Sequence, residues 1–299
     1  MAMHHVTLMD GGMGQELHRR SGKPASPLWS AQVMMDSPEL VVQLHRDYID
    51  AGADVIEVNA YTATPERLAR DADGALFEPL QKAALNAATR ARDLSGKPVL
   101  IAGCLPPLVA SYHPDLVPDE QTARASYGRI IALQNSAVDL FLGETLSTVR
   151  EGAIVARAAA ETGKPVWISY TVDDSDGTRL RSGERLDDGV EAAARAGAEA
   201  VLVNCSMPEA VAQAMAVLST SGLRYGGYAN GFTAIDALAP GGTVDSLRAR
   251  EDLTPTEYAN HAMSWLEQGA SLIGGCCEVG PAHIAEIRQR LDAAQPWLQ

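Results

Sequence analysis

Short apolar runs alternate with longer amphipathic stretches along the whole chain. The apolar runs have the length and the flanking turn residues of buried strands. They cover residues 6–10, 53–60, 99–103, 139–143, 166–171, 200–204, 224–229 and 271–275. Between them, apolar side chains recur every three or four residues, as Leu40, Leu44 and Tyr48 do, and this spacing predicts helices. The chain therefore repeats a strand–helix unit eight times.

The residues between the runs support these boundaries. Pro38 and Pro255 stand where a first helical position is expected, and Gly96 and Gly163 follow the ends of predicted helices. Strands that are separated by a helix pair in parallel, because a parallel pair needs a crossover connection. Eight such units favour a closed barrel, and Asp10-Gly11-Gly12-Met13-Gly14 lacks the Gly-x-Gly-x-x-Gly spacing of a dinucleotide-binding open sheet. The predicted fold is α/β, a (β/α)₈ TIM barrel that forms a single domain over residues 1–299.

Composition and charge narrow the class of protein. A chain of 299 residues has the usual size of one such barrel. Its net charge of −14 argues against a nucleic-acid partner, which needs lysine and arginine to neutralise phosphates. The longest apolar runs are interrupted by Arg or Glu, so no membrane span is predicted. The first nine residues lack the apolar core of a signal peptide, which predicts a cytoplasmic protein.

The predicted strand ends carry an unusual set of polar residues. Active sites of these barrels form where the strands end, and the two long loops at 105–122 and 233–254 are expected to cover that face. The residues at the strand ends are Asp10, Asn59, Gly103, Glu144, Tyr170, Cys205, Asn230 and the Cys276-Cys277 pair. Three of the four cysteines of the chain are therefore expected on one rim.

Cys205, Cys276 and Cys277 are predicted to bind Zn²⁺, because three thiolates with an open fourth position are typical of a catalytic zinc site. The alternatives are a vicinal disulfide or simple packing for the adjacent pair, and a small buried hydrophobe for Cys104. Neighbouring side chains on a strand point to opposite faces, so both cysteines reach one metal only if the chain bends. The preceding Gly274-Gly275 permits such a bend.

A three-thiolate zinc favours one kind of chemistry. The thiolates quench the Lewis acidity of the metal, so it activates a fourth thiolate better than it activates water. The implied reaction is alkyl transfer to sulfur. A metal-dependent hydrolase would need a cluster of His and Asp ligands at the strand ends, and the sequence has none there.

Ordered motifs along almost the whole chain resemble one family. They are Met9-Asp10-Gly11-Gly12-Met13-Gly14, Asn59-Ala60-Tyr61-Thr62-Ala63-Thr64-Pro65, Gly143-Glu144-Thr145-Leu146-Ser147, Val203-Asn204-Cys205, Tyr228-Ala229-Asn230-Gly231, Gly274-Gly275-Cys276-Cys277 and Gly280-Pro281-Ala282-His283-Ile284. The chain resembles the homocysteine S-methyltransferases, which include betaine-, S-methylmethionine- and methyltetrahydrofolate-dependent members. The Asn-Cys and Gly-Gly-Cys-Cys motifs are the most specific part of this resemblance.

The resemblance implies roles for individual residues. Cys205, Cys276 and Cys277 carry over as zinc ligands. Asp10 and Glu144 are implied as catalytic-site residues near the amino group of homocysteine, which suits two carboxylates. The backbone amides of Gly11 and Gly12 are implied to meet its carboxylate, and Asn59 and Asn230 to make further polar contacts. The alternatives are a turn-forming role for Asp10, a helix-dipole role for Glu144, and loop-stabilising roles for the two asparagines.

The donor side departs from the family pattern. Many members have Arg-Thr where this chain has Glu278-Val279, and Tyr-Pro-Asn where it has Tyr228-Ala229-Asn230; betaine users have a tyrosine at the place of Thr62. The length of the chain resembles that of members that use a sulfonium donor, S-methylmethionine or S-adenosylmethionine. Trp29, Tyr61, Tyr170 and Phe232 are candidates for cation–π contact with a sulfonium methyl group, and a structural role is the favoured alternative for each of them.

The predicted activity is methyl transfer from such a donor to homocysteine, giving methionine, with small molecules as partners. Alternatives are another thiol or selenol acceptor, a betaine, folate or corrinoid donor, and a non-catalytic metal- or thiol-binding barrel. Whether the chain forms a homo-oligomer is left open by the sequence.

Overall fold

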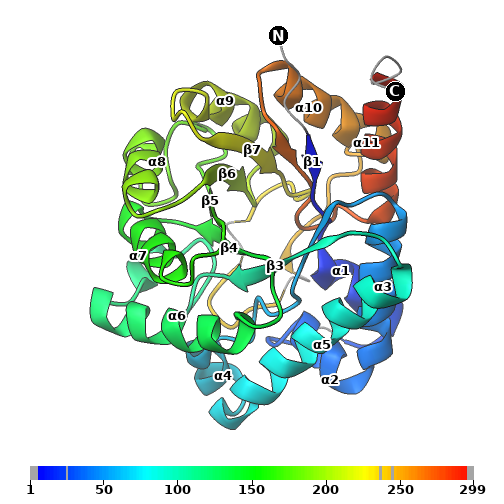
Figure 1. Cartoon of the computed structure of the whole chain (residues 1–299), viewed down its shortest axis with the longest axis vertical. Helices are drawn as coiled ribbons and strands as arrows, with labels where there is room; N and C mark the ends of the chain where they lie inside the picture. Colours follow the sequence, from blue (N-terminus) through cyan, green and yellow to red (C-terminus); the bar gives the residue numbers. More distant parts are fainter. Residues whose placement is uncertain (1–5, 25, 236–237, 244–245, 295–299) are drawn as a thin grey trace.

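The strands of the chain close into a barrel, as the sequence predicts. The computed structural model describes residues 6–24, 26–235, 238–243 and 246–294. Eight strands in this described part form one parallel sheet in the order β1-β8-β7-β6-β5-β4-β3-β2. The two ends of the sheet meet through a bridge between Met9 and Val55, where the N–H of Asp10 donates to the carbonyl of Val55 at 2.9 Å. Figure 1 shows the helices surrounding these strands. The molecule is therefore a single α/β domain with a nearly closed (β/α)₈ barrel.

The elements alternate along the chain. The strands are β1 (Thr7–Leu8), β2 (Val55–Glu57), β3 (Leu100–Leu105), β4 (Leu140–Leu146), β5 (Val166–Tyr170), β6 (Ala200–Asn204), β7 (Arg224–Tyr228) and β8 (Leu272–Ile273). The helices are α1 (Met13–Ser21), α2 (Ser30–Asp36), α3 (Pro38–Asp50), α4 (Pro65–Asp71), η1 (Gly74–Leu76), α5 (Phe77–Ser95), η2 (Pro114–Leu116), α6 (Glu120–Gln134), α7 (Val149–Ala160), α8 (Leu186–Arg195), α9 (Pro208–Leu218), α10 (Pro255–Glu267) and α11 (Pro281–Ala294). Each predicted apolar run contains one of the strands.

Two apolar layers hold the barrel together. Alternate strand residues face the surrounding helices and join the large core, which includes Leu8, Ile56 and Ile273. The others face the barrel interior. They form a second cluster of buried residues: Met9, Val55, Ala102, Leu140, Leu142, Trp167, Ala200, Leu202, Tyr228 and Leu272. The interior is therefore a packed core, and the polar strand-end residues lie above it.

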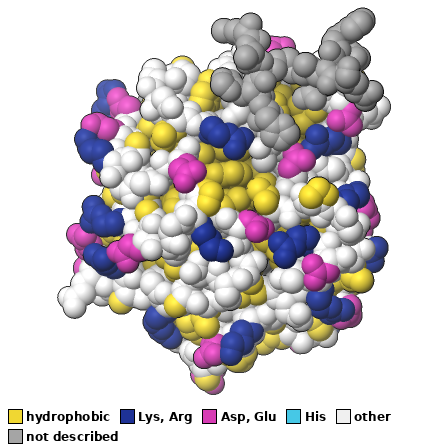
Figure 2. Space-filling model, viewed as in Figure 1, with side chains coloured by type: hydrophobic (Ala, Val, Ile, Leu, Met, Phe, Trp, Pro, Cys, Tyr) yellow, Lys and Arg dark blue, Asp and Glu magenta, His cyan; other side chains and the backbone are white. Residues whose placement is uncertain are grey.

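The surface carries both signs of charge. On the face that Figure 2 shows, apart from the grey atoms, hydrophobic side chains gather near the centre, with Lys/Arg and Asp/Glu side chains interspersed around them. This mixture is unlike the extended basic surface that binds nucleic acid. Among the described residues, every helix is too short or too polar to cross a membrane. The cytoplasmic location and the homo-oligomer stay predictions.

Candidate metal and substrate site

Three cysteine side chains meet at the C-terminal end of the barrel. Cys205 directly follows β6, and Cys276 and Cys277 lie in the loop after β8. The three Sγ atoms all lie within 4.8 Å of one another, and the Sγ atoms of Cys205 and Cys276 are 2.9 Å apart. All three cysteines are free of disulfides. The cysteines that the sequence singled out are therefore brought together from two distant loops.

Backbone hydrogen bonds among three loops position Cys276 and Cys277. The N–H of Cys276 donates to the carbonyl of Ala229 at 3.0 Å, and the N–H of Gly231 donates to the carbonyl of Cys277 at 2.8 Å. On the other side, the N–H of Gly275 donates to the carbonyl of Asp10 at 2.9 Å. The loop after β8 is thus tied to the loops after β7 and β1, which leaves its sulfurs in one place.

Glycines let these loops approach closely. A Cβ atom on Gly12 would lie 2.4 Å from the carbonyl oxygen of Cys276, and one on Gly275 would lie 2.1 Å from Cγ1 of Val279. β8 ends at Ile273, so both cysteines lie in a loop and the alternation of strand side chains does not apply to them. The loop turns at Glu278, whose φ is 65°. The expected role of Gly274-Gly275 as a bend in a strand is therefore wrong. At Gly275 a glycine is needed because a larger side chain would collide with Val279.

Asn204 organises the floor of the site. Its side chain is completely buried, and its Oδ1 accepts from the N–H of Thr145 at 2.8 Å and from the hydroxyl of Ser169 at 2.7 Å. Its Nδ2 donates to Oγ1 of Thr145 at 2.9 Å and lies 3.9 Å from Sγ of Cys276. Thr145 and Cys205 both have left-handed backbones, with φ of 58° and 49°. Such strain in residues other than glycine persists only where the surroundings enforce it. Asn204 belongs to the Val203-Asn204-Cys205 motif, but the motif alone did not predict a role for its side chain.

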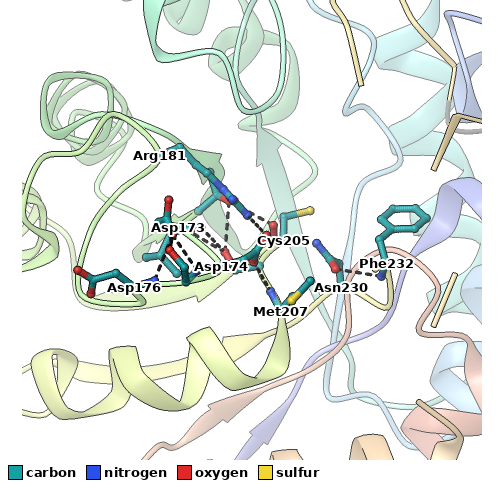
Figure 3. A network of polar contacts seen from close by, with 12 residues as sticks. Asp173, Asp174, Asp176, Arg181, Cys205, Met207, Asn230 and Phe232 are labelled. Atoms are coloured by element: carbon teal, nitrogen blue, oxygen red, sulfur yellow. Dashed lines mark hydrogen bonds and ion pairs between the residues drawn. The ribbon is translucent and has the colours of Figure 1, made fainter. Parts of the chain in front are cut away.

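The loop after β5 supports Cys205 from outside (Figure 3). Oδ1 of Asp174 accepts from the N–H of Met207 at 2.7 Å, and its Oδ2 pairs with Arg181 at 2.8 Å. The hydroxyl of Thr171 donates to the carbonyl of Cys205 at 3.2 Å. The guanidinium of Arg181 also lies 5.6 Å from the centre of the Tyr112 ring. This network joins the loops after β3, β5 and β6 beside the cysteines.

The sulfur atoms share protons unequally. Hydrogen bonds from the Cys276 and Cys277 thiols lower the pKa of Cys205 well below its usual value, and the Tyr112 side chain adds a further hydrogen bond. The same contact with Cys205 raises the pKa of Cys276. Without a cation, the cluster therefore favours one thiolate, on Cys205, with its two neighbours as thiols.

Three carboxyl groups, those of the buried Asp10 and Glu144 and of the half-buried Glu57, lie in the same pocket. Asp10 and Glu144 are 6% and 5% exposed, and Oδ2 of Asp10 accepts from the N–H of Glu57 at 2.9 Å. Burial raises the pKa of Asp10 to about 8 and that of Glu144 to about 7. Burial and the neighbouring carboxylates of Glu144 and Asp10 raise the pKa of Glu57 as well. Asp10 and Glu144 were expected here; Glu57 was missed, because one Glu in an apolar strand carries no distinctive signal.

Of the other predicted contact residues, Asn59, Gly11 and Gly12 line the pocket, whereas Asn230 does not. Asn59 is 5% exposed, lines the pocket, and its Nδ2 has no hydrogen-bond partner among the described residues. Asn230 is not among the residues that line the pocket, and its Oδ1 accepts from the N–H of Phe232 at 3.1 Å, which stabilises its own loop. Gly11 and Gly12 line the pocket, but the N–H of Gly12 already donates to the carbonyl of Val279 at 3.0 Å.

Cys104 is buried, as predicted, but its surroundings are polar. Its side chain is 1% exposed, and its Sγ donates to Oε1 of Glu144 at 3.2 Å. Burial is the main cause of a pKa raised well above the usual thiol value, so Cys104 stays protonated. It therefore acts as a hydrogen-bond donor to the carboxyl cluster and lies apart from the three-cysteine group.

Aromatic side chains line the outer part of the pocket. Trp29, Tyr61, Tyr112, Tyr228 and Phe232 all contribute, and the rings of Trp29 and Tyr61 pack edge to face with centroids 6.2 Å apart. Both long loops line the pocket as expected, since Tyr112 comes from the first and Leu238 and Leu247 come from the second.

Tyr170 does not belong to this aromatic group. It is completely buried, and its hydroxyl donates to the carbonyl of Gly189 at 2.8 Å. The suggestion that its ring faces a sulfonium is therefore wrong, because the side chain points outward to α7 and α8, where it also approaches Gly152.

Arg67 is the basic side chain among the described residues that line this pocket. It donates to the carbonyl of Pro107 at 3.0 and 3.2 Å and to the hydroxyl of Ser111 at 3.3 Å, and it lies over the ring of Tyr61. Its N–H groups are thus bound by neutral acceptors of the pocket wall. A pocket with three carboxyl groups, three sulfurs and aromatic rings suits cationic ligands.

Comparison with known proteins places this site in a family. The sequence model described as homocysteine S-methyltransferase matches residues 7–291. Homocysteine S-methyltransferase from Escherichia coli (strain K12) is 32% identical over 307 residues, which cover 95% of each chain. A selenocysteine methyltransferase from Astragalus bisulcatus is 26% identical, with 97% of this chain and 94% of that protein covered.

Solved structures agree with this match. The metallated form of the homocysteine methyltransferase MmuM from Escherichia coli superposes with a TM-score of 0.79 at 28% identity, covering 96% of both chains. An oxidised form of the same protein gives the same TM-score, with 95% of this chain and 96% of that one covered. The chain is a methyltransferase and belongs to the homocysteine S-methyltransferase family.

Proposed function

We propose that this enzyme transfers a methyl group from a sulfonium donor to the thiolate of homocysteine and gives methionine. The observation that carries the proposal is the meeting of three cysteine sulfurs with a pocket of buried carboxyl groups and aromatic rings. The sulfurs suit a metal that binds a fourth sulfur, and the rest of the pocket suits cations. The thiol of the acceptor, its amino group and the sulfonium of the donor then each have a matching group in the pocket.

Zinc fits the three sulfurs in number and kind. A tetrahedral zinc with Zn–S bonds of about 2.3 Å separates its sulfur ligands by roughly 3.8 Å. The sulfurs lie within 4.8 Å of one another, and the Cys205–Cys276 separation of 2.9 Å would have to widen. When bound, zinc would lower the pKa of the acceptor thiol and keep its sulfur nucleophilic at neutral pH. Cys205, Cys276 and Cys277 would hold it.

The carboxyl groups would bind and orient the acceptor. Asp10 and Glu144 face the ammonium group of homocysteine in this proposal, and the N–H of Gly11 meets its carboxylate. Gly12 lets its loop approach Cys276 closely but donates no hydrogen bond to the substrate, because its N–H already donates to the carbonyl of Val279. Asn59 offers an unpaired Nδ2 to the same carboxylate or to the donor. These contacts would align the acceptor sulfur with the methyl group.

The aromatic wall would receive the donor. A sulfonium carries a positive charge next to the methyl group that moves, and the rings of Trp29 and Phe232 in this wall attract such a charge. Tyr61 and Tyr112 each already have an arginine over one ring face. A folate donor is anionic and would need free basic side chains, whereas Arg67 is engaged by Pro107 and Ser111. The pocket therefore favours a sulfonium. The loops over it would also exclude water from the transfer.

A selenol is a second candidate acceptor. The similarity to a selenocysteine methyltransferase supports it, because selenium and sulfur share this chemistry. A comparison of homocysteine with selenocysteine under the same donor would rank the two.

The metal assignment has a direct test in the chain itself. The native protein is expected to contain one zinc per chain after purification with zinc, and Cys205→Ala is expected to lose it. Cys104→Ala provides the matched control, because Cys104 is also a buried cysteine of the barrel but lies outside the three-sulfur group. Zinc that stays stoichiometric in Cys205→Ala, or is lost equally in both variants, would contradict the assignment.

A further inference from the structure

Glu57 points into the barrel at the level of the site. Val55 belongs to the interior cluster, and side chains two residues apart on a strand share a face, so Glu57 lies on that face one step nearer the strand ends. The same alternation places Cys104 and Glu144 above Ala102 and Leu142. A carboxyl oxygen of Glu57, Sγ of Cys104 and a carboxyl oxygen of Glu144 all lie within 4.8 Å of one another.

These carboxyl groups have no ion-pair partner in the part of the chain that the structure describes; the positive charge of Arg67, in the same pocket, acts on Glu144 only from a longer distance. Among the described residues, no ion pair involves Asp10, Glu57 or Glu144. Oε1 of Glu57 is buried and has no hydrogen-bond partner there either. A carboxyl oxygen of Glu57 lies within 4.8 Å of one of Glu144, the carboxyl group that we propose for the acceptor's ammonium. Burial raises the pKa of these groups and keeps protons on Asp10 and Glu57 in the ligand-free chain. A cation that enters would lower those pKa values and let the groups ionise beside it, so this arrangement suits a ligand that brings a cation.

We infer that Glu57 is a specificity-determining residue that binds the α-ammonium group of the acceptor together with Glu144 and restricts the acceptor to amino thiols. This inference rests on the proposed function. An ammonium group has three N–H donors and can serve Asp10, Glu57 and Glu144 at once. A thiol without an amino group would leave the carboxyl cluster unpaired and would gain nothing from Glu57.

The ammonium explanation accounts for the cluster better than a second metal does. Glu57, Cys104 and Glu144 form the other group in the described residues with the spacing of metal ligands. The Cys104 thiol, however, keeps its proton and donates a hydrogen bond to Glu144, and a protonated thiol is a poor metal ligand. Metal analysis distinguishes the two explanations.

The test uses the zinc-loaded full chain and two acceptors. Homocysteine is compared with 4-mercaptobutyrate, which has the same thiol and carboxylate but lacks the amino group. In Glu57→Gln, KM for homocysteine is expected to rise roughly tenfold or more, as for the loss of one hydrogen bond to a charged group. KM for 4-mercaptobutyrate and kcat for both acceptors are expected to change less than about twofold. Glu57→Asp is expected to restore part of the preference.

Glu151→Gln is the matched control. Glu151 is also a buried glutamate, but it binds Ser147 and lies outside the pocket, so the preference for homocysteine should stay as in the native protein. Thermal unfolding of each variant separates loss of fold from loss of binding.

Distinct results would overturn the role of Glu57. They are an equal rise in KM for both acceptors, a rise in KM for the donor alone, an unchanged preference in Glu57→Gln, or a second stoichiometric metal that this variant loses. A native protein that methylates neither acceptor would instead contradict the proposed function itself, so the two failures are distinguishable.

Discussion

The pocket has a sulfur side and a carboxyl side, and they are built in different ways. The sulfur side consists of Cys205, Cys276 and Cys277, which lie on loops tied together by backbone hydrogen bonds. The carboxyl side consists of Asp10, Glu57 and Glu144, whose side chains are positioned by strands but lack an ion-pair partner among the described residues. The sulfur side suits an ion that stays bound, and the carboxyl side suits a cation that enters and leaves with the substrate.

Removal of the metal should have the largest effect. After chelation, methyl transfer is expected to fall by about a thousandfold or more, since a thiol is far less nucleophilic than a thiolate. The fold should persist, because the strand pairing does not involve the cysteine side chains. Activity and circular dichroism measured before and after chelation check this. Recovery with Zn²⁺ and not with Mg²⁺ is the control; full activity in the metal-free protein would contradict the role of the sulfur side.

Gly12→Ala should disturb the sulfur side through its backbone. The new Cβ would lie 2.4 Å from the carbonyl oxygen of Cys276, so the loop must shift. We expect a loss of roughly 1–3 kcal/mol in the free energy of unfolding and weaker metal binding. Denaturant unfolding and metal titration measure both. In the control Gly128→Ala, nothing lies within 4 Å of the new Cβ on α6, and stability should rise slightly. Equal behaviour of the two variants would contradict the close approach.

The carboxyl side should make the ligand-free protein less stable as the pH rises. Burial raises the pKa of Asp10 from 3.8 to about 8 in the folded chain. The folded state therefore holds this proton between about pH 4 and pH 8 while the unfolded state has lost it, so the free energy of unfolding falls as the pH rises through this window. A change of at least about 1 kcal/mol is expected between pH 5 and pH 8. Asp10→Asn should flatten this dependence, and an unchanged slope in that variant would contradict it.

Arg181→Gln should have the smallest effect. Arg181 is 12% exposed at its side chain, pairs with Asp174 and lies over Tyr112. Its replacement is expected to lower the free energy of unfolding by about 1 kcal/mol and to alter the alkylation rate of Cys205 in the metal-free protein. Arg179→Gln, at a more exposed arginine in the same loop, serves as the control. No difference between the two variants would exclude a supporting role for the network in Figure 3.

The sequence predicted most of the fold and the sulfur side. Apolar runs mark the strands because a barrel strand is buried on both faces, and every run contains a strand. The boundaries differ by a few residues; β4 continues to Leu146, so Glu144 lies within the strand and not after it. Cysteines stand out because they are rare in this chain and lie at strand ends.

The carboxyl side and the walls were harder to predict. Glu57 is a single charge in an apolar strand, and only the closed barrel reveals that it faces Glu144. Tyr112 lies in a long loop whose path depends on tertiary contacts with Arg181 and Cys205. Tyr170 was misplaced because the side of the sheet that a strand residue faces depends on register. Which residues share a pocket is therefore decided by contacts between distant segments.

One measurement tests the central claim most directly. The zinc-loaded enzyme is incubated with homocysteine and S-methylmethionine whose two sulfonium methyl groups are trideuterated, and the methionine formed is examined by mass spectrometry. The donor is itself left as methionine with one trideuterated methyl group, so the account predicts two such methionines for each homocysteine consumed, and none from Cys205→Ala. Absence of labelled methionine with this donor and with methyl-labelled S-adenosylmethionine, or equal labelling by Cys205→Ala, would contradict it.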